Sequence, residues 1–111
     1  MDKEIRVAFI DVNTKIIFEK LKDGKFEDKE LYGLIQSAID NLVKNPEKGI
    51  KISRKLWPVV YIKEYKIINL WKYNLPKGWR LIYTIKENEV EIVSIILEWF
   101  DHKEYERRFG Y

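Results

Sequence analysis

Several residue types are scarce in this chain of 111 residues, which contains no Cys, one His, one Met and three Pro. Without Cys there is neither a disulfide framework nor a thiolate metal site, and one His without carboxylates at ligand spacing gives no zinc or di-metal signature. We therefore expect no metal and no other cofactor. No apolar run approaches the roughly 18 residues of a membrane helix. The first residues, MDKEIRVAFID, also lack the pattern of a signal peptide, so we expect a cytoplasmic protein without a membrane partner.

The composition that remains is that of a small folded domain. The chain has a mass of 13.5 kDa, is 46% hydrophobic and contains four Trp and seven Tyr. This is enough for one hydrophobic core and too little for two, so we expect a single domain over residues 1–111. The net charge of +3 and the pI of about 9.0 permit a polyanionic partner but do not require one.

The N-terminal half predicts one strand and two helices. Residues 5–10 alternate apolar and other side chains, as in a strand with one buried face that joins a sheet. A short helix is expected from a cap at Asp11, Asn13 or Thr14 through about Leu21. A second helix is expected from a cap at Asp28 to Asn45, because apolar residues recur there at spacings of three and four. The two helices are expected to form a hairpin that covers one face of the sheet.

The C-terminal half predicts an antiparallel meander followed by a short helix. Pro58 is expected to begin a short helix, because Pro is tolerated at a first helical position. Three apolar runs then follow at residues 69–73, 79–86 and 89–99, separated by turn residues. Polar residues from 101 onward predict a last helix. The expected fold is α+β, with an N-terminal strand and a helical hairpin packed on an antiparallel sheet with a short C-terminal helix.

Lys72 and Arg80 are the basic residues that first suggest a site. If residues 74–78 form the loop between their two strands, Lys72 lies directly across from Arg80. Like charges in opposite positions destabilise a sheet by roughly a few tenths of a kcal/mol. A sheet that holds such a pair without an adjacent acid is expected to bind an anion, most simply a phosphate. The alternative is that Arg80 reaches along the sheet to Glu91 or Glu98.

A second basic group occupies the segment Lys51-Ile52-Ser53-Arg54-Lys55. Its composition is that of a loop that contacts phosphates, and equally that of an ordinary exposed loop. On the first interpretation Lys51, Arg54 and Lys55 contact a phosphate backbone. On the second they keep the protein in solution, and the sequence does not decide between the two.

Two short motifs in the last 43 residues resemble those of a known family. Trp79-Arg80-Leu81-Ile82-Tyr83 resembles the hydrophobic-Arg-hydrophobic-hydrophobic-Tyr strand of the RelE/ParE superfamily of bacterial and archaeal toxin components. Asp101-His102-Lys103-Glu104-Tyr105 is similar to that superfamily's terminal His-Arg/Lys-x-x-Tyr element. The order of a strand, a helical pair and a meander extends the resemblance over nearly the whole chain. More closely, NLWKYNLPKGWRLIYTI and EWFDHKEYERRFGY resemble an archaeal RelE-like branch.

The resemblance implies the toxin component of a type II toxin–antitoxin system, with a cognate antitoxin protein as its partner. On the RelE side it implies a metal-independent, ribosome-dependent mRNA endonuclease, whose second partner is mRNA on the ribosome. The alternative is a non-catalytic binding module of the same fold. Such a module would be a ParE-like inhibitor of DNA gyrase or an inactive toxin homologue.

The endonuclease reaction assigns roles to particular residues. RNA cleavage without a metal uses the 2′-hydroxyl of the substrate as nucleophile, and needs a proton acceptor, a proton donor and stabilisation of negative charge on phosphorus. The resemblance gives the charge stabilisation to Arg80 and proton transfer to His102 and Tyr105, which share a helix face at this spacing. The residues expected to contact RNA are Lys51, Arg54, Lys55, Lys72 and Lys103.

Each residue of the tail also has a structural interpretation. His102 fits a helix cap or a surface position, and Tyr105 fits a core aromatic packed against Phe109. Acidic residues flank the proposed site and oppose RNA binding unless they face away or pair with Lys103, Arg107 or Arg108. These acids are Glu98, Asp101, Glu104 and Glu106. They argue against strong binding of free RNA and fit a site that is completed on a ribosome.

Overall fold

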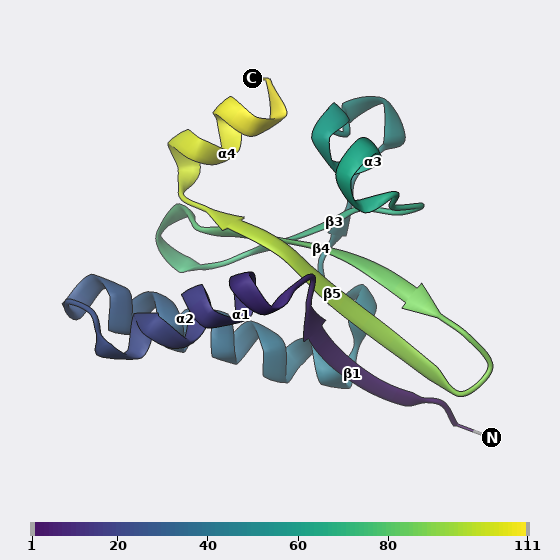
Figure 1. The fold of residues 1–111 in the computed structure, drawn as a ribbon, viewed down its shortest axis with the longest axis horizontal. Helices are drawn as coiled ribbons and strands as arrows, with labels where there is room; N and C mark the ends of the chain where they lie inside the picture. The colour runs from purple at the N-terminus through teal and green to yellow at the C-terminus, as the bar shows by residue number, and fades with distance from the viewer. Residues whose placement is uncertain (1, 111) are drawn as a thin grey trace.

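A mixed five-stranded sheet with helices on both faces organises the computed structural model, which describes residues 2–110 (Figure 1). The strands are β1 (Glu4–Phe9), β2 (Ile50–Lys51), β3 (Trp71–Asn74), β4 (Arg80–Glu87) and β5 (Glu91–Phe100). The helices are α1 (Val12–Lys20), α2 (Phe26–Lys44), α3 (Val59–Tyr65) and α4 (His102–Phe109). The single domain expected over residues 1–111 also includes Met1 and Tyr111, which lie outside the described residues.

The strand order is β1-β5-β4-β3-β2, and the predicted α+β class is confirmed. Strands β3, β4 and β5 form the expected antiparallel meander. The N-terminal strand joins the sheet as predicted, and it pairs with β5 in parallel. None of the helices within residues 2–110 has the length and hydropathy of a membrane span.

Helices α1 and α2 form the predicted hairpin on one face of the sheet. Asp11 caps α1 by accepting a hydrogen bond from the backbone N–H of Thr14 at 2.7 Å. The predicted cap of α2 is wrong by one helical turn, since Lys25 is its N-cap residue. Asp28 lies inside the first turn and accepts from the backbone N–H of Lys25 at 3.0 Å. Asp28 therefore supports the start of the helix from its first turn, by accepting from the N–H of the N-cap residue, and is not itself the N-cap.

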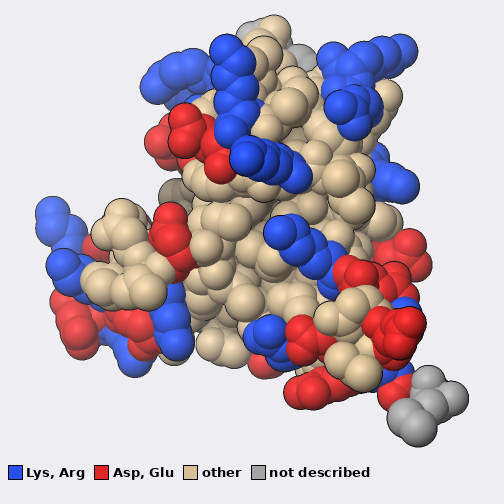
Figure 2. Space-filling view, turned by 45° about the vertical axis from the view of Figure 1, so that its right-hand side comes forward, with Lys and Arg blue, Asp and Glu red and all other residues tan. Residues whose placement is uncertain are grey.

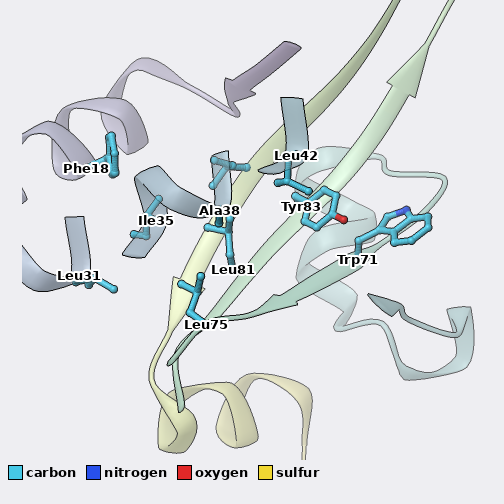
Figure 3. Packing of buried hydrophobic residues seen from close by; sticks show 10 residues of the cluster. Phe18, Leu31, Ile35, Ala38, Leu42, Trp71, Leu75, Leu81 and Tyr83 are labelled. Carbon is cyan, nitrogen blue, oxygen red and sulfur yellow. The ribbon is translucent and has the colours of Figure 1, made fainter. Parts of the chain in front are cut away.

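The hydrophobic core of this face lies between α2 and the middle of the sheet (Figure 3). The apolar residues of α2 that recur every three or four positions point toward Leu81 and Tyr83 of β4, both fully buried. These buried residues of α2 are Leu31, Ile35, Ala38 and Leu42. Burying each large aliphatic side chain contributes about 1.5–3 kcal/mol, so this contact fixes the helix on the sheet.

Helices α3 and α4 cover part of the opposite face, in the upper half of Figure 1. Helix α3 follows Pro58, as predicted, and its Tyr61 and Tyr65 rings stack with centroids 6.0 Å apart. Tyr61 is fully buried together with Ile82 and Leu97 of the sheet and with Tyr105 of α4. The sheet therefore has two separate cores, one on each face.

The predicted register of the β3–β4 hairpin is wrong by two positions. Lys72 pairs with Ile82, and Arg80 pairs with Asn74. The loop begins one residue later than expected, because the backbone N–H of Leu75 bonds to the carbonyl of Trp79 at 2.8 Å. Within this loop residues 77 and 78 take left-handed conformations, with φ of 63° and 80°. This turn places Lys72 diagonally from Arg80 rather than opposite it.

Candidate functional site

Two cations from neighbouring strands meet over the ring of Tyr105. Lys72 Nζ lies 5.1 Å and Arg80 Cζ 5.6 Å from the centre of this ring. Lys72 Nζ also donates a hydrogen bond to the Tyr105 hydroxyl oxygen at 3.2 Å. Both cations lie on the face that carries α3 and α4, because Arg80 shares the face of Ile82 and Lys72 pairs with Ile82. We call these three residues, Lys72, Arg80 and Tyr105, the cation cluster.

The charges of the cation cluster have no acidic partner in the part of the chain that the structure describes. Arg80 Nη1 donates to the backbone carbonyl of Trp79 at 3.2 Å, which leaves the rest of its guanidinium fork for other acceptors. Neither Lys72 nor Arg80 belongs to an ion pair among residues 2–110. A pair of cations in this state favours an anion, which would offset their mutual repulsion.

The alternative that Arg80 binds Glu91 or Glu98 is wrong. Glu91 accepts from Arg6 of β1 at 3.2 Å, and Glu98 accepts from Arg108 of α4 at the same distance. Each carboxylate has a cation nearer to it than Arg80, because β1 lies beside β5 and α4 folds back over it. Arg80 therefore stays with the cation cluster.

Helix α4 carries Tyr105 to the sheet. Asp101 caps the helix by accepting from the backbone N–H of Glu104 at 2.8 Å, and Gly110 ends it with a φ of 76°. Tyr105 is only 4% exposed, and its ring stacks on Phe109 with centroids 4.6 Å apart. The core interpretation of Tyr105 is therefore confirmed. Its hydroxyl nevertheless reaches Lys72, so the same side chain belongs to the core and to the cation cluster.

His102 lies at the start of α4 in different surroundings from Tyr105. Its side chain is 63% exposed, and Nε2 lies 3.3 Å from a carboxylate oxygen of Glu106. On its other side, its Cβ lies next to Gly78 in the β3–β4 loop. The surface interpretation of His102 is therefore correct, and His102 lies about one helical turn before Tyr105 in α4.

The other predicted RNA-contacting residues are dispersed. Lys51 pairs with Trp71, and its Nζ lies 6.0 Å from that ring on the face that α1 and α2 cover. Lys51 and Arg80 therefore do not belong to one site, because the two side chains lie on opposite faces of the sheet. Arg54 stacks over Trp57 at 5.2 Å, and Lys55 is exposed in the same short turn.

Lys103 is exposed on α4. Among the five lysines and arginines expected to contact RNA, the structure brings Lys72 alone to Arg80 and Tyr105. The site that the tertiary structure builds is consequently smaller than the one that the sequence suggested.

A network around Glu98 was only partly foreseen from the sequence. Glu98 accepts from Arg108, as one of the expected acid–base pairs of the tail, and also from the hydroxyl of Tyr61. Arg108 Cζ lies 5.9 Å from the Tyr61 ring. Burial is the largest cause of the raised pKa of Tyr61, and the hydrogen bond with the Glu98 carboxylate is the second. The sequence offered one signal for this network, the carboxylate of Glu98 within the apolar run of β5. It did not predict that Tyr61 of α3 binds this carboxylate.

This network fixes α4 against α3 and β5. A bulge in β5 opposite Ile82 and Tyr83 places Glu98 on the face where Tyr61 and Arg108 lie. The helix that carries Tyr105 is thereby held on one side by Glu98 and on the other by Lys72. Within residues 2–110 no group of three or more His, Asp and Glu side chains has a geometry that could hold a metal ion.

Comparison with protein families gives one result that covers most of the chain. Residues 13–97 match the family model described as the ParE toxin of the type II toxin–antitoxin system, parDE. The matched span includes Lys72 and Arg80 and ends before α4. Comparisons with curated proteins and with solved structures found no match. Because the matched residues make up well over half of the chain, this protein belongs to the ParE toxin family of type II toxin–antitoxin systems.

Proposed function

We propose that this toxin is a metal-independent endonuclease that cleaves mRNA on the ribosome, and that the cation cluster binds the scissile phosphate. The observation that carries the proposal is the convergence of Lys72 and Arg80 on Tyr105 with no acidic partner among residues 2–110. Two such cations on one sheet face suit the two non-bridging oxygens of a phosphodiester. A guanidinium is well shaped for this, because its fork donates two parallel hydrogen bonds.

The reaction follows from the chemistry of RNA. The 2′-oxygen attacks phosphorus, the bond to the 5′-oxygen breaks, and a 2′,3′-cyclic phosphate and a 5′-hydroxyl result. One proton leaves the 2′-hydroxyl and one is delivered to the 5′-oxygen. In this proposal Arg80 and Lys72 stabilise the additional negative charge on the phosphorane oxygens. His102 removes or supplies a proton from the exposed start of α4, and the Tyr105 hydroxyl, bound to Lys72, donates to the substrate.

The acidic tail supports dependence on the ribosome. Glu98 is paired with Arg108, so one of the four flanking acids is partly neutralised by the tail itself, and Glu106 lies 3.3 Å from Nε2 of His102. Asp101 is engaged as a helix cap, and Glu104 stays exposed. The remaining negative charge weakens contact with free RNA, since phosphate contacts supply most of such binding. A ribosome would supply the missing binding energy by holding the mRNA in place.

A second candidate function is a non-catalytic module that inhibits a protein target such as DNA gyrase. Three observations favour it: the matched family is described by its ParE members, the match ends before His102 and Tyr105, and Tyr105 is only 4% exposed. Under this alternative, Lys72 serves to anchor α4 through Tyr105. Arg80 then binds an acidic surface of the target.

One pair of assays separates the two candidates. The purified chain is added to ribosomes programmed with mRNA and, separately, to DNA gyrase in a supercoiling reaction. Arg80→Ala is expected to reduce mRNA cleavage by about 100-fold, as the loss of a group that stabilises the transition state does. Arg6→Ala, which removes an exposed arginine from the same sheet, is the control and is expected to keep full activity. Gyrase inhibition without mRNA cleavage by the unaltered chain would instead establish the second candidate.

A further inference from the structure

Strand β1 forms an edge of the sheet, and β5 is its single strand neighbour among residues 2–110. The backbone N–H of Glu4 donates to the carbonyl of Val90, directly before β5, at 3.0 Å. Because successive residues of a strand direct their backbone groups to opposite sides, the even-numbered residues of β1 face β5. The outward N–H and C=O groups are those of Ile5, Val7 and Phe9. These residues therefore offer hydrogen-bond donors and acceptors to one further strand.

This edge lacks several features that usually prevent strands of different molecules from pairing, which are shortness, Pro, bulges and a covering element. The opposite edge, β2, has two residues, whereas β1 has six, contains no Pro and pairs with β5 in an unbroken register. A hollow of about 580 Å³ lies between β1 and the α1–α2 hairpin, and one of about 540 Å³ lies beside β1 over β4 and β5. The side chains of an added strand therefore have space on both faces of the sheet.

The charges on β1, which discourage pairing with an uncharged strand, are of both signs and unequally compensated. Arg6 Nε donates to Glu91 at 3.2 Å and Nη2 at 3.3 Å, which leaves Nη1 for another acceptor. Glu4 lies opposite the same Glu91 in the β1–β5 register and belongs to no ion pair among residues 2–110. Like charges in opposite positions destabilise a sheet, so a further cation beside Glu4 would stabilise this edge.

We propose that two copies of this protein pair along β1, antiparallel and related by a two-fold axis at Ile5, so that their sheets join. In this register the two copies of Ile5 exchange backbone hydrogen bonds. Glu4 of each copy lies opposite Arg6 of the other, in the pairs whose side chains approach most closely, so both acids gain a cation. An axis at Glu4 or Arg6 would place like charges opposite each other, and an axis at Val7 would place Arg6 opposite Ala8. Charge therefore selects the axis at Ile5.

A second copy fits this edge better than a nucleic acid. Figure 2 shows Asp and Glu side chains gathered at the lower right, where β1 begins in Figure 1, with Lys and Arg side chains beside them, whereas Lys and Arg predominate at the top. An edge with both signs of charge does not attract a polyanion, but it can match a copy of itself. Strand pairing buries little surface, so the dimer is expected to be reversible. Because β5 separates β1 from β4, the pairing leaves the cation cluster open and is independent of the proposed RNA cleavage.

Sedimentation equilibrium of the whole protein measures the affinity of the dimer. Glu4→Lys and Arg6→Glu are each expected to weaken it by about tenfold or more, because two symmetry-related pairs change from attraction to repulsion. An equimolar mixture of the two variants is expected to dimerise again, since each variant supplies the charges that the other needs. The controls Glu89→Lys, in the exposed β4–β5 turn, and Lys20→Glu, in the last turn of α1, are expected to change the affinity by less than about twofold.

Amide hydrogen exchange of the unaltered protein provides a measurement that does not depend on the folding of any variant. The amides of Ile5 and Val7 are expected to exchange more slowly as the protein concentration rises, and those of the β4–β5 turn to keep their rates. The proposal is overturned if the protein stays monomeric at every concentration, or if a dimer forms without protection of these amides. It is equally overturned if the mixture stays monomeric although circular dichroism shows both variants folded.

Two peptides test whether the edge selects its own sequence. One has the sequence of residues 2–10, and the other is an uncharged peptide of the same length with alternating Thr and Val. Stronger binding of the first peptide supports the proposal, because it carries the charges that match Glu4 and Arg6. Equal binding of the two would make β1 a general acceptor of strands and overturn the proposal.

Discussion

The side-chain ammonium of Lys72 donates a hydrogen bond to the hydroxyl oxygen of Tyr105, 3.2 Å away, and joins the middle of β3 to α4. Because Arg80 lies over the same ring, the last helix and the two cations form one unit. Tyr105 therefore affects the position of the cations as well as the packing of the tail. The contribution of the Tyr105 hydroxyl can therefore be measured separately from that of its ring.

Tyr105→Phe is expected to lower the free energy of unfolding by about 1–2 kcal/mol, because it removes the hydroxyl that Lys72 binds but keeps the ring on Phe109. Lys72→Met is expected to have an effect of similar size. The double variant should lose less than the sum of the two, since both remove the same hydrogen bond. Urea unfolding of the four proteins measures the coupling, and strictly additive losses would show that the two side chains act independently.

The role of His102 is tested by the pH dependence of mRNA cleavage. If its imidazole transfers a proton, the rate should show an inflection with pH that depends on this imidazole. His102→Gln is expected to remove the inflection and lower the rate, whereas Glu106→Gln, which removes its partner, should keep an inflection. If the cleavage rate of His102→Gln depended on pH as that of the unaltered protein does, His102 would have no part in catalysis, and the cation cluster alone would carry it.

Tyr83 is expected to make the fold sensitive to alkali. Its hydroxyl donates to the carbonyl of Pro46 at 2.7 Å and accepts from the N–H of Gly49 at 3.2 Å. Burial raises the pKa of Tyr83 from 10.0 to about 12. Between these values the unfolded chain loses this proton while the folded chain keeps it, so the free energy of unfolding falls as the pH rises from 10 to about 12.

Urea unfolding at several pH values checks this prediction, together with the absorbance of the phenolate. Tyr83→Phe is expected to reduce stability at pH 8 by about 1–3 kcal/mol, because the buried carbonyl of Pro46 and the half-buried N–H of Gly49 lose their partner. It should also weaken the alkaline decline, although the raised pKa of Tyr61 leaves part of it in place. A Tyr83 that ionises at pH 10 in the folded protein would contradict the proposed burial effect.

Gly49→Ala is expected to destabilise the edge of the sheet where β2 pairs with β3. A Cβ at this position would lie 2.6 Å from the carbonyl oxygen of Lys72 and 2.6 Å from the Tyr83 hydroxyl. Relieving these contacts moves the backbone and is expected to reduce stability by about 1–3 kcal/mol. Gly33→Ala is the control, because nothing lies within 4 Å of its Cβ position and alanine favours a helix. Thermal melting should therefore shift in opposite directions for the two variants.

The amino-acid sequence by itself determined the fold class, the four α-helices and the strands β1, β3, β4 and β5, but not β2, which lies in a segment with the composition of a loop. The spacing of apolar residues in α2 specified its buried side, because the period of an α-helix leaves little choice of face. The turn residues between three β-rich runs specified the meander in the same way. Arg80 was identified from its position in a motif, and Tyr105 from its spacing in the tail. These are local properties, because each depends only on residues that are close together in the sequence.

Only the tertiary structure decided which of these residues meet. The left-handed conformations in the β3–β4 loop set the register and moved Lys72 diagonally from Arg80, a choice that depends on backbone geometry rather than on composition. The faces of the sheet then separated Lys51 from Arg80, because a shift of one position along a strand reverses a side chain. The contact of Tyr105 with Lys72 required α4 to fold back on the sheet. Contacts between residues far apart in the chain depend on this packing, and no local pattern encodes it.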